Sequence, residues 1–208
     1  CGGLENRYSQ RWESRVRIPP SPPVFLGSII LIKVMPDTLR KIELNNGSVS
    51  SKNLMESLTI DFKADTLILE NVQDPGNVGT LLRSAAAANI KQVICTQGSA
   101  SLWSPRVLRA GMGAHFSLHC FENFQLTDIL PKFQIPVFVT SSHHSTNLYT
   151  KDLTQTCVWI LGNEGQGASD YALEHAQAVA IPQPGGQESL NVAIAGSICF
   201  FEMVRQRQ

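Results

Sequence analysis

Apolar and polar positions follow a regular pattern from residue 64 to the end of the sequence. Short apolar runs of four or five residues alternate there with segments of helical periodicity. Such runs predict buried strands. The predicted strands are Thr66–Leu69, Gln92–Cys95, Pro136–Thr140, Cys157–Leu161 and Ala178–Ile181.

Helices are predicted in the segments between these strands. Asn77 stands where a helix cap belongs, ahead of an apolar stripe and the alanine run 85–88. Ser104 and Pro105 provide a second cap and a first helical position. Further helical patterns cover Ser169–Ala176 and Asn191–Val204. Strands that alternate with helices predict an α/β fold, with a parallel sheet and helices on both faces.

Three zones divide the sequence. Residues 1–23 are rich in Arg, Ser and Pro, which predicts a disordered basic tail. This tail is either native or spurious read-through from an upstream gene, because Val-Arg-Ile-Pro at 16–19 can be encoded by DNA resembling the T-arm of a transfer-RNA gene. Residues 24–63 are too short for a domain and predict an appendage or a truncated module. Residues 64–208 carry the α/β pattern.

Charge and composition exclude several classes of protein. The 208 residues hold 17 Lys and Arg and 17 Asp and Glu. Residues 1–41 hold seven basic and three acidic residues, whereas residues 42–208 hold ten and fourteen. Any nucleic-acid partner must therefore be held by a local patch rather than by the overall field. The longest apolar run, Val24–Ile32, is far shorter than the ~20 residues of a membrane span, so no membrane integration is expected.

The cysteines predict a reducing compartment. Five cysteines are spread along the sequence without a C-x-x-C pair: Cys1, Cys95, Cys120, Cys157 and Cys199. This spacing supports neither a zinc site nor a disulfide framework, and we expect the protein in the cytoplasm.

Three segments place glycines and polar side chains after predicted strands. They are Asn71–Arg83, Leu161–Ser169 and Ile181–Asn191. Ligands of open α/β sheets bind outside the carboxyl ends of strands, so these segments are candidate binding loops. Gly162–Gly167 is not a G-x-G-x-x-G motif and no phosphate-loop lysine follows it, so nucleoside triphosphate binding has no support. Taken singly, each segment could also be a plain turn or connector.

Taken together and in order, the three segments resemble the signature motifs of the SPOUT superfamily, and within it the SpoU/TrmH class of RNA 2′-O-ribose methyltransferases. The first motif is Asn77 with Arg83 six residues later, and the second is Leu-Gly-Asn-Glu-Gly-Gln-Gly at 161–167. The third is Ile-Pro followed by Glu-Ser-Leu-Asn-Val-Ala within 181–193. The resemblance covers about Thr66–Arg207.

The resemblance implies a fold, a methyl donor and an assembly. It implies a C-terminal trefoil knot that holds S-adenosylmethionine, an active homodimer whose site borrows residues across the interface, and no metal. Residues implied to bind the donor are Thr140, Ser141, Leu161, Gly162, Asn163, Gly165, Ile181, Pro182, Ser189, Leu190 and Asn191.

The resemblance also implies catalytic roles, for Arg83, Asn77, Glu164, Ser189 and Asn191. Arg83 would act as general base or as a phosphate clamp that stabilises a developing alkoxide. A guanidinium with a pKa above ~12 favours the clamp. The two asparagines and Ser189 would orient Arg83 and the ribose. Glu164 would pair with Arg83 or anchor its loop, or it is a solvated loop carboxylate.

Other candidates have weaker support. Arg106 and Arg109 lie three residues apart on one helical face and would grip RNA phosphate or form an ordinary solvated face. The pair His143–His144 has no evident partners for a metal. His115 is expected to be structural, and Cys157 lies in a buried strand without an activating context.

The resemblance therefore implies an S-adenosylmethionine-dependent enzyme that methylates a ribose 2′-hydroxyl in RNA. Ribosomal RNA is the first expectation, and transfer RNA is the alternative. Neither DNA nor a membrane is expected as a partner. Many relatives carry an RNA-recruiting module before this domain, so residues 24–63 are expected to be either a short appendage or a truncated module of that kind. A rival from another class is a non-catalytic dimeric scaffold that binds S-adenosylmethionine or RNA.

Overall fold

The computed structural model describes residues 59–142, 146–186 and 189–208. The predicted tail over residues 1–23, residues 24–58 of the predicted appendage and the pair His143–His144 lie outside these described residues.

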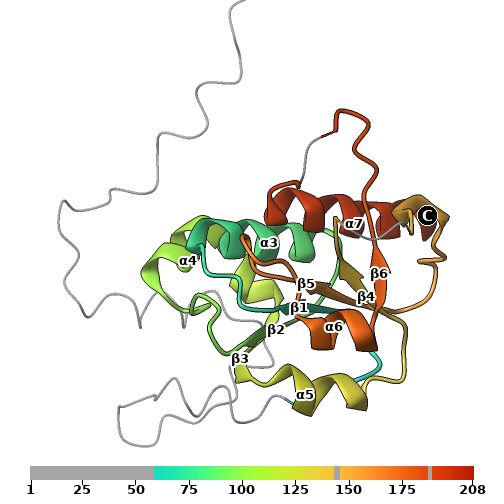
Figure 1. Cartoon of the computed structure of the whole chain (residues 1–208). Helices are drawn as coiled ribbons and strands as arrows, with labels where there is room; N and C mark the ends of the chain where they lie inside the picture. The colour runs from blue at the N-terminus through green and yellow to red at the C-terminus, as the bar shows by residue number, and fades with distance from the viewer. Residues whose placement is uncertain (1–58, 143–145, 187–188) are drawn as a thin grey trace, which may run out of the picture. The chain divides into compact units, whose positions relative to one another are not determined.

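One parallel sheet organises the described residues. Its strand order is β3-β2-β1-β5-β4-β6 (Figure 1). The strands are β1 (Thr66–Leu69), β2 (Gln92–Thr96), β3 (His119–Phe124), β4 (Val137–Thr140), β5 (Val158–Leu161) and β6 (Gln177–Val179). Thr66 of β1 lies opposite both Gln92 and Val158 in the register. Because every neighbouring pair is parallel, all the carboxyl ends of the strands lie at one edge.

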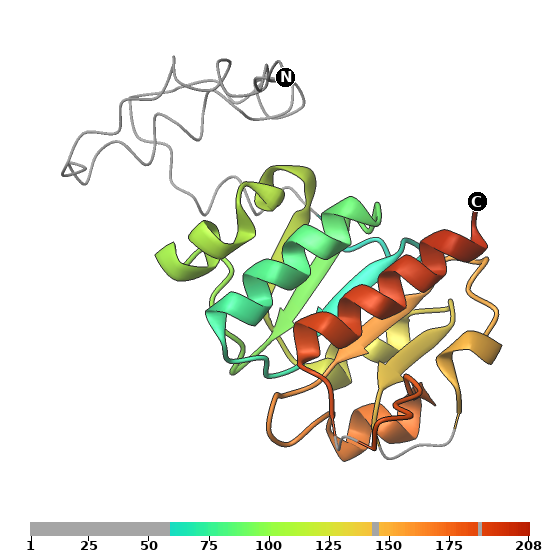
Figure 2. The ribbon, with the colours of Figure 1, turned by 90° about the horizontal axis from the view of Figure 1, so that it is seen from above.

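Helices cover both faces of this sheet, which confirms the predicted architecture. The α-helices are α3 (Pro75–Ala87), α4 (Pro105–Gly111), α5 (Leu126–Ile129), α6 (Asp170–His175) and α7 (Val192–Gln206). Short 3₁₀ helices are η2 (Ala114–Ser117), η3 (Leu130–Lys132) and η4 (Leu148–Thr150). In Figures 1 and 2, α3, α4 and α7 lie over one face, and α5 and α6 lie beneath the other.

Alternate side chains of each strand fill two separate cores. Leu67 and Leu69 of β1 point to the face that α3 and α7 cover, where Trp159 and Phe200 are also fully buried. Ile68 points to the other face, into the cluster beneath which α5 and α6 pack. The four residues of β1 are all inaccessible to solvent, as the central position of the strand requires.

The first helix begins earlier than the sequence predicts. Asp74, not Asn77, is the N-cap of α3, and its carboxylate accepts from the main-chain N–H of Asn77 at 2.8 Å. Pro75 takes the first helical position, because its fixed φ suits a helix and its missing N–H would have no partner there. Asn77 therefore lies inside the first turn, and its side chain is left for other partners.

Two strands also differ from the prediction. The strand β3 was not predicted, because His119, Glu122 and Asn123 interrupt its apolar pattern, and a register shift disturbs its pairing with β2. The predicted strand Ala178–Ile181 is found at Gln177–Val179. The chain leaves the sheet at Ala180, where the N–H of Ala180 donates to the carbonyl of Thr146 at 2.7 Å.

The last helix is apolar along most of its length and packs beside α3. The helical pattern was predicted to begin at Asn191, which is instead the N-cap and accepts from the N–H groups of Ala193 and Ile194. The hydroxyls of Ser84 and Ser197 bridge α3 and α7 at 2.7 Å. The outer side of α7 exposes Ile194 and Phe201, at 54% and 50% of their surface.

The chain segment just before β1 is already part of this folded unit. Ile60 and Phe62 pack against the core that contains Ile68. The Phe62 and Phe133 rings meet edge-on, with their centroids 5.0 Å apart. Among the helices of the described residues, none has the length and apolar character needed to cross a membrane.

Candidate functional site

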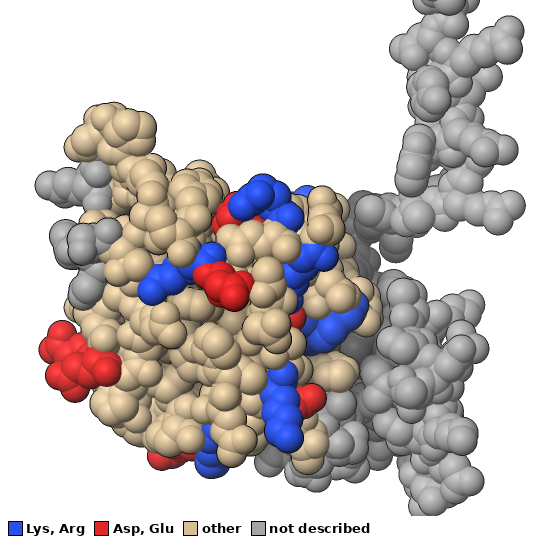
Figure 3. Space-filling model, turned by 90° about the vertical axis from the view of Figure 1, so that its right-hand side faces the viewer, with Lys and Arg blue, Asp and Glu red and all other residues tan. Residues whose placement is uncertain are grey.

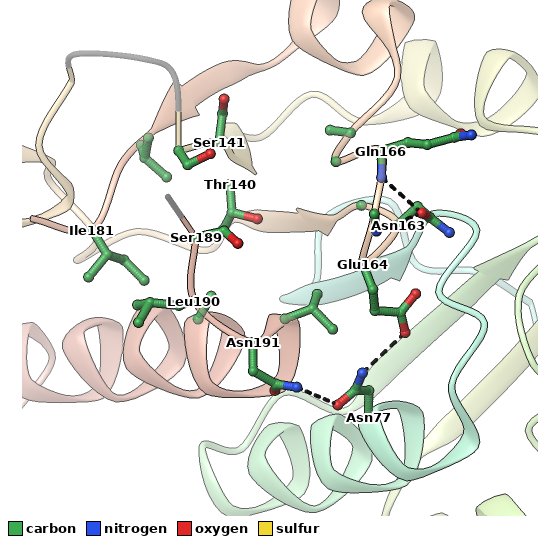
Figure 4. A pocket seen from close by; sticks show the side chains of 18 of the residues that line it. Asn77, Thr140, Ser141, Asn163, Glu164, Gln166, Ile181, Ser189, Leu190 and Asn191 are labelled. Atoms are coloured by element: carbon green, nitrogen blue, oxygen red, sulfur yellow. Dashed lines mark hydrogen bonds between the residues drawn. The ribbon is translucent and has the colours of Figure 1, made fainter. Parts of the chain in front are cut away.

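A cavity of about 520 Å³ lies at the carboxyl ends of β4, β5 and β6 (Figure 4). All three segments that the sequence singled out contribute to its wall. The site residues implied by the family resemblance that line it are Asn77, Thr140, Ser141, Gly162, Asn163, Glu164, Gly165, Ile181, Ser189, Leu190 and Asn191. Residues far apart in the sequence thus meet at one sheet edge, where parallel α/β folds bind ligands.

The loop after β5 forms a compact turn that Asn163 holds from within. Its side-chain oxygen accepts from the N–H groups of Gly165 and Gln166 at 2.9 and 3.0 Å. Its side-chain nitrogen donates to the carbonyl of Asn71 at 2.9 Å, which ties the loop to the end of β1. A methyl group at Gly162 would overlap main-chain atoms of Gly167 and Ala168, so only glycine allows this closure.

Glu164 ties this loop to the start of α3. Its carboxylate accepts from the N–H groups of Gln73 and Asp74 at 3.2 and 3.1 Å, and from the Asn77 side chain at 3.2 Å. The Asn77 side-chain oxygen then accepts from Asn191 at 3.0 Å. Figure 4 shows the resulting chain of three side chains from three different segments along one end of the cavity. We call it the Glu164–Asn77–Asn191 chain.

Hydrogen bonding keeps Glu164 ionised. Partial burial would by itself raise the pKa of its carboxyl, but hydrogen bonding to its own main chain and to Asp74, Asn77 and Gln73 outweighs it and lowers the pKa. The carboxylate is therefore charged at neutral pH, and it acts as an acceptor only.

The other end of the cavity has aliphatic and hydroxyl side chains. Ile181 and Leu190 lie there, at a distance from Glu164 and Asn77 in Figure 4. Thr140 and Ser141 close the cavity from the end of β4, and the N–H of Ser141 donates to the carbonyl of Val179 at 2.9 Å. The cavity thus has an amide-rich end and an opposite end where Ile181 and Leu190 lie on the same side as Thr140, Ser141 and Ser189.

Several implied site residues do not line this cavity. Leu161 is fully buried as the last residue of β5, and Pro182 is exposed just after Ile181. The three arginines Arg83, Arg106 and Arg109 are exposed on α3 and α4. Within the described part of the chain, the Glu164 carboxylate accepts hydrogen bonds from Gln73, Asp74 and Asn77 and makes none with Arg83.

Sequence reasoning also left cavity residues unassigned. These are Ser142, Gln166, Gly167, Ala168, Leu173, Val179, Gln183, Val192 and Ala195. Gln166 and Gly167 lie inside the motif at 161–167, so the motif could have identified them as cavity residues. Leu173 and Ala195 lie on α6 and α7, and nothing in a helical pattern distinguishes a cavity residue from a core residue.

His115 and Cys157, for which the sequence suggested no chemical role, are both buried in the structure. His115 is 4% exposed and donates through Nε2 to the carbonyl of Leu102 at 2.8 Å, with Trp103 beside its ring. Burial lowers the pKa of His115, although the bond to Leu102 acts in the opposite direction. Burial raises the pKa of the Cys157 thiol to about 12, which leaves it unreactive at neutral pH.

The surface charge is mixed. On the face shown in Figure 3, basic and acidic side chains are interspersed among uncharged ones rather than gathered in one basic patch. This agrees with the acidic balance of residues 42–208.

Comparisons with known proteins give the cavity a context. A model of the SpoU rRNA methylase family matches residues 65–201. An uncharacterized tRNA/rRNA methyltransferase of Synechocystis sp. is 38% identical over 145 residues, 68% of this chain and 53% of that protein. The 23S rRNA (guanosine-2′-O-)-methyltransferase RlmB of Haemophilus ducreyi is 34% identical over 146 residues, 68% of this chain and 59% of that protein. The chain thus spans somewhat more than half the length of these curated relatives.

A solved structure shows the same fold. The SpoU methyltransferase AviRb from Streptomyces viridochromogenes, in complex with the cofactor AdoMet, aligns with a TM-score of 0.67 and 25% sequence identity. The alignment covers 73% of this chain and 64% of that chain. From the parallel sheet, the cavity built by three ordered motifs and the match over residues 65–201, we conclude that the chain belongs to the SpoU rRNA methylase family.

Proposed function

We propose that this protein transfers a methyl group from S-adenosylmethionine to a ribose 2′-hydroxyl in RNA, with ribosomal RNA as the first candidate. The observation that carries the proposal is the cavity itself, where Ile181 and Leu190 lie opposite the Glu164–Asn77–Asn191 chain at the carboxyl edge of the sheet. The activity for which the RlmB relative is named, guanosine-2′-O-methylation of 23S rRNA, supports the same reaction.

The cavity suits S-adenosylmethionine in size and chemistry. Its volume of about 520 Å³ falls in the range of small-molecule sites. Ile181 and Leu190 offer apolar surface for the adenine ring, and the open main chain near Gly162 offers hydrogen bonds. Thr140, Ser141, Asn163, Gly165 and Ser189 would complete the donor site, with Leu161 and Pro182 supporting it from outside the cavity. When bound, the donor supplies a methyl group on a positively charged sulfur.

The reaction needs alignment more than it needs acid–base chemistry. Displacement at the methyl carbon is in line, so the protein must hold the ribose oxygen opposite the sulfur. We assign Arg83 to the RNA phosphate, because a guanidinium stays charged and cannot serve readily as a base. Arg106 and Arg109 on α4 would extend this contact to neighbouring phosphates. Asn191 and Ser189 would face the ribose.

A homodimer is part of the proposal. Ile194 and Phe201 leave half of their surface exposed on the outer side of α7, which suits burial against a second copy. Arg83 lies outside the cavity of its own chain, so in the dimer it would serve the cavity of the second copy.

We also propose the trefoil knot and a cytoplasmic location. The tight turn at Gly162 and the pairing of Asn147 with Ala180 support a knotted path for the chain around the cavity. The four described cysteines are all unpaired and buried, which suits a reducing compartment.

A direct test uses tritiated S-adenosylmethionine with 23S ribosomal RNA and transfer RNA transcribed in vitro. We expect label in RNA and a labelled dinucleotide that survives alkaline hydrolysis, because a 2′-O-methyl group blocks cleavage there. Label in alkali-sensitive mononucleotides would mean base methylation and would contradict the proposal. Label only in transfer RNA would favour the alternative substrate, and donor binding without any RNA labelling would favour a scaffold.

A further inference from the structure

Donors and acceptors in the Glu164–Asn77–Asn191 chain run in one fixed order. A carboxylate only accepts, so the Asn77 nitrogen must face Glu164, at 3.2 Å. The Asn77 oxygen then faces Asn191, whose nitrogen donates to it at 3.0 Å. The Asn191 oxygen caps α7. Turning over either carboxamide would break at least two hydrogen bonds.

This order leaves one spare N–H on each asparagine. A carboxamide nitrogen carries two N–H groups, and each asparagine uses one of them among the described residues. Both residues line the cavity, at the amide-rich end shown in Figure 4. No Lys or Arg of the described part of this chain lines it. The cavity wall therefore presents two oriented, uncharged donors at that end.

Resting on the proposed function, we infer that the spare N–H groups of Asn77 and Asn191 bind the ribose 2′-oxygen and stabilise the negative charge that develops on it. Glu164 is then a positioning residue, because it acts through Asn77. In the transfer, the hydroxyl proton passes to water as the oxygen begins to attack, so negative charge develops on the 2′-oxygen. A lone pair of this oxygen forms the bond to the methyl carbon, and the carbon–sulfur bond breaks with its electron pair on sulfur, which yields S-adenosylhomocysteine.

Preorganisation explains why neutral amides suffice. Donors that already point at a developing oxyanion need no reorientation during the reaction, and such a donor typically contributes a factor of about 10²–10³ in rate. The Glu164 carboxylate supplies this fixed orientation without touching the ribose.

The variant Asn191→Asp tests the donor directly. An aspartate can still cap α7, but it has no N–H and places an acceptor where the donor was. With whichever RNA transcript the wild type methylates, we expect kcat to fall about 100-fold or more. We expect the Kd for S-adenosylmethionine, measured by calorimetry, to change within about threefold. Any rise in the KM for RNA should be far smaller than the fall in kcat, because the lost contact to the 2′-oxygen strengthens as charge develops. Asn123→Asp, an exposed matched change outside the cavity, should leave all three values unaltered.

A double variant separates donation from mere structure. Asn77→Asp with Glu164→Gln rebuilds the chain, because the new amide donates to the new carboxylate and Asn191 still donates to it. We expect each single change to lower the melting temperature and the double change to restore it in part, because the N–H of Asp74 loses its acceptor on residue 164. The rate should stay about 100-fold low, because the donor at position 77 is gone.

Each outcome decides between the possibilities. A double variant whose rate recovers with its stability, or an Asn191→Asp protein that turns over normally, would overturn the donor assignment alone. Wild-type protein that binds S-adenosylmethionine but methylates no transcript would overturn the proposed function, and the donor assignment with it.

Discussion

Glu164 is the residue on which the amide-rich end of the cavity depends. One carboxylate joins the loop after β5 to the main chain of Gln73 and Asp74 and to the side chain of Asn77. Charge-assisted hydrogen bonds of this kind are stronger than neutral ones. Replacement of the carboxylate therefore affects two loops and the first turn of α3 together.

The ionisation of Glu164 gives a pH dependence. Because folding lowers the pKa of this carboxyl, its contribution to stability is complete above the ordinary glutamate value of about 4.3 and declines as the pH falls through and below it. We expect the difference in melting temperature between wild type and Glu164→Gln to be constant from pH 8 to pH 6 and to shrink toward pH 4. A difference that grows on acidification would reverse the assigned sign.

Arg83 provides a second test at the residue scale. Arg83→Ala removes the proposed phosphate clamp but no residue of the cavity wall. We expect calorimetry to show unchanged binding of S-adenosylmethionine, while RNA methylation falls about 100-fold or more. Lys91→Ala, another exposed basic residue, is the control. Unchanged turnover in Arg83→Ala would remove this arginine from the mechanism.

Removal of divalent metal should not stop the reaction. The proposed groups are amides, a carboxylate and a guanidinium, and displacement of a sulfonium leaving group needs no Lewis acid. We expect methylation to persist in EDTA once the RNA has been folded beforehand. Loss of activity that added Mg²⁺ restores would contradict the metal-free mechanism.

Helix starts are the elements that build the cavity. Asp74 and Asn191 cap α3 and α7, and Ser169 caps α6 directly after the glycine loop. A cap fixes both where a helix begins and the direction in which the chain enters it. The caps of α3 and α7 therefore hold Asn77 and Asn191 close enough to bond.

The cap of α3 can be tested by stability. Asp74→Ala removes the acceptor for the N–H of Asn77, and such a loss typically costs about 1 kcal/mol. For a chain of this size, that corresponds to a fall of roughly 2–4 °C in melting temperature. Asp128→Ala on α5 is the matched control, because its carboxylate caps no helix end. Equal effects of the two changes would mean that the cap has no special role.

Sequence patterns predicted the buried elements well and the polar ones poorly. The strand β1 matches its prediction because all four of its side chains are buried and its apolar run is uninterrupted. The strand β3 was missed because it lies at the sheet edge, where half-exposed positions tolerate polar residues. Asn77 was taken as a cap because residue type alone does not tell a capping asparagine from one in the first turn.

At the scale of the whole molecule, the cavity could be inferred only through the order of three motifs. Each motif by itself is compatible with an ordinary turn. The parallel strand order brings the loops after β1, β5 and β6 to one edge, and this long-range arrangement is not visible in local periodicity. For the same reason, the sequence did not determine which residues form hydrogen bonds with Glu164.

Association of two copies is the test at this scale. Ile194→Asp with Phe201→Asp places charges on the exposed side of α7, where the proposed dimer would bury both residues. We expect light scattering to show a dimer for the wild type and a monomer for the double variant. Tyr149→Asp, whose side chain is 51% exposed on η4, should leave the mass unchanged. A wild-type monomer would contradict the proposed assembly.

The order of α7 after all six strands of the sheet has a consequence for synthesis on the ribosome. The apolar face formed by Leu67, Leu69 and Trp159 is covered in part by Cys199, Phe200 and Met203. The strand β1 also gains its second neighbouring strand only after β5 has been synthesised. A nascent chain that has emerged only as far as the glycine loop therefore exposes part of this apolar face of the sheet to solvent. Synthesis of α7, which follows all six strands in the sequence, then covers this face.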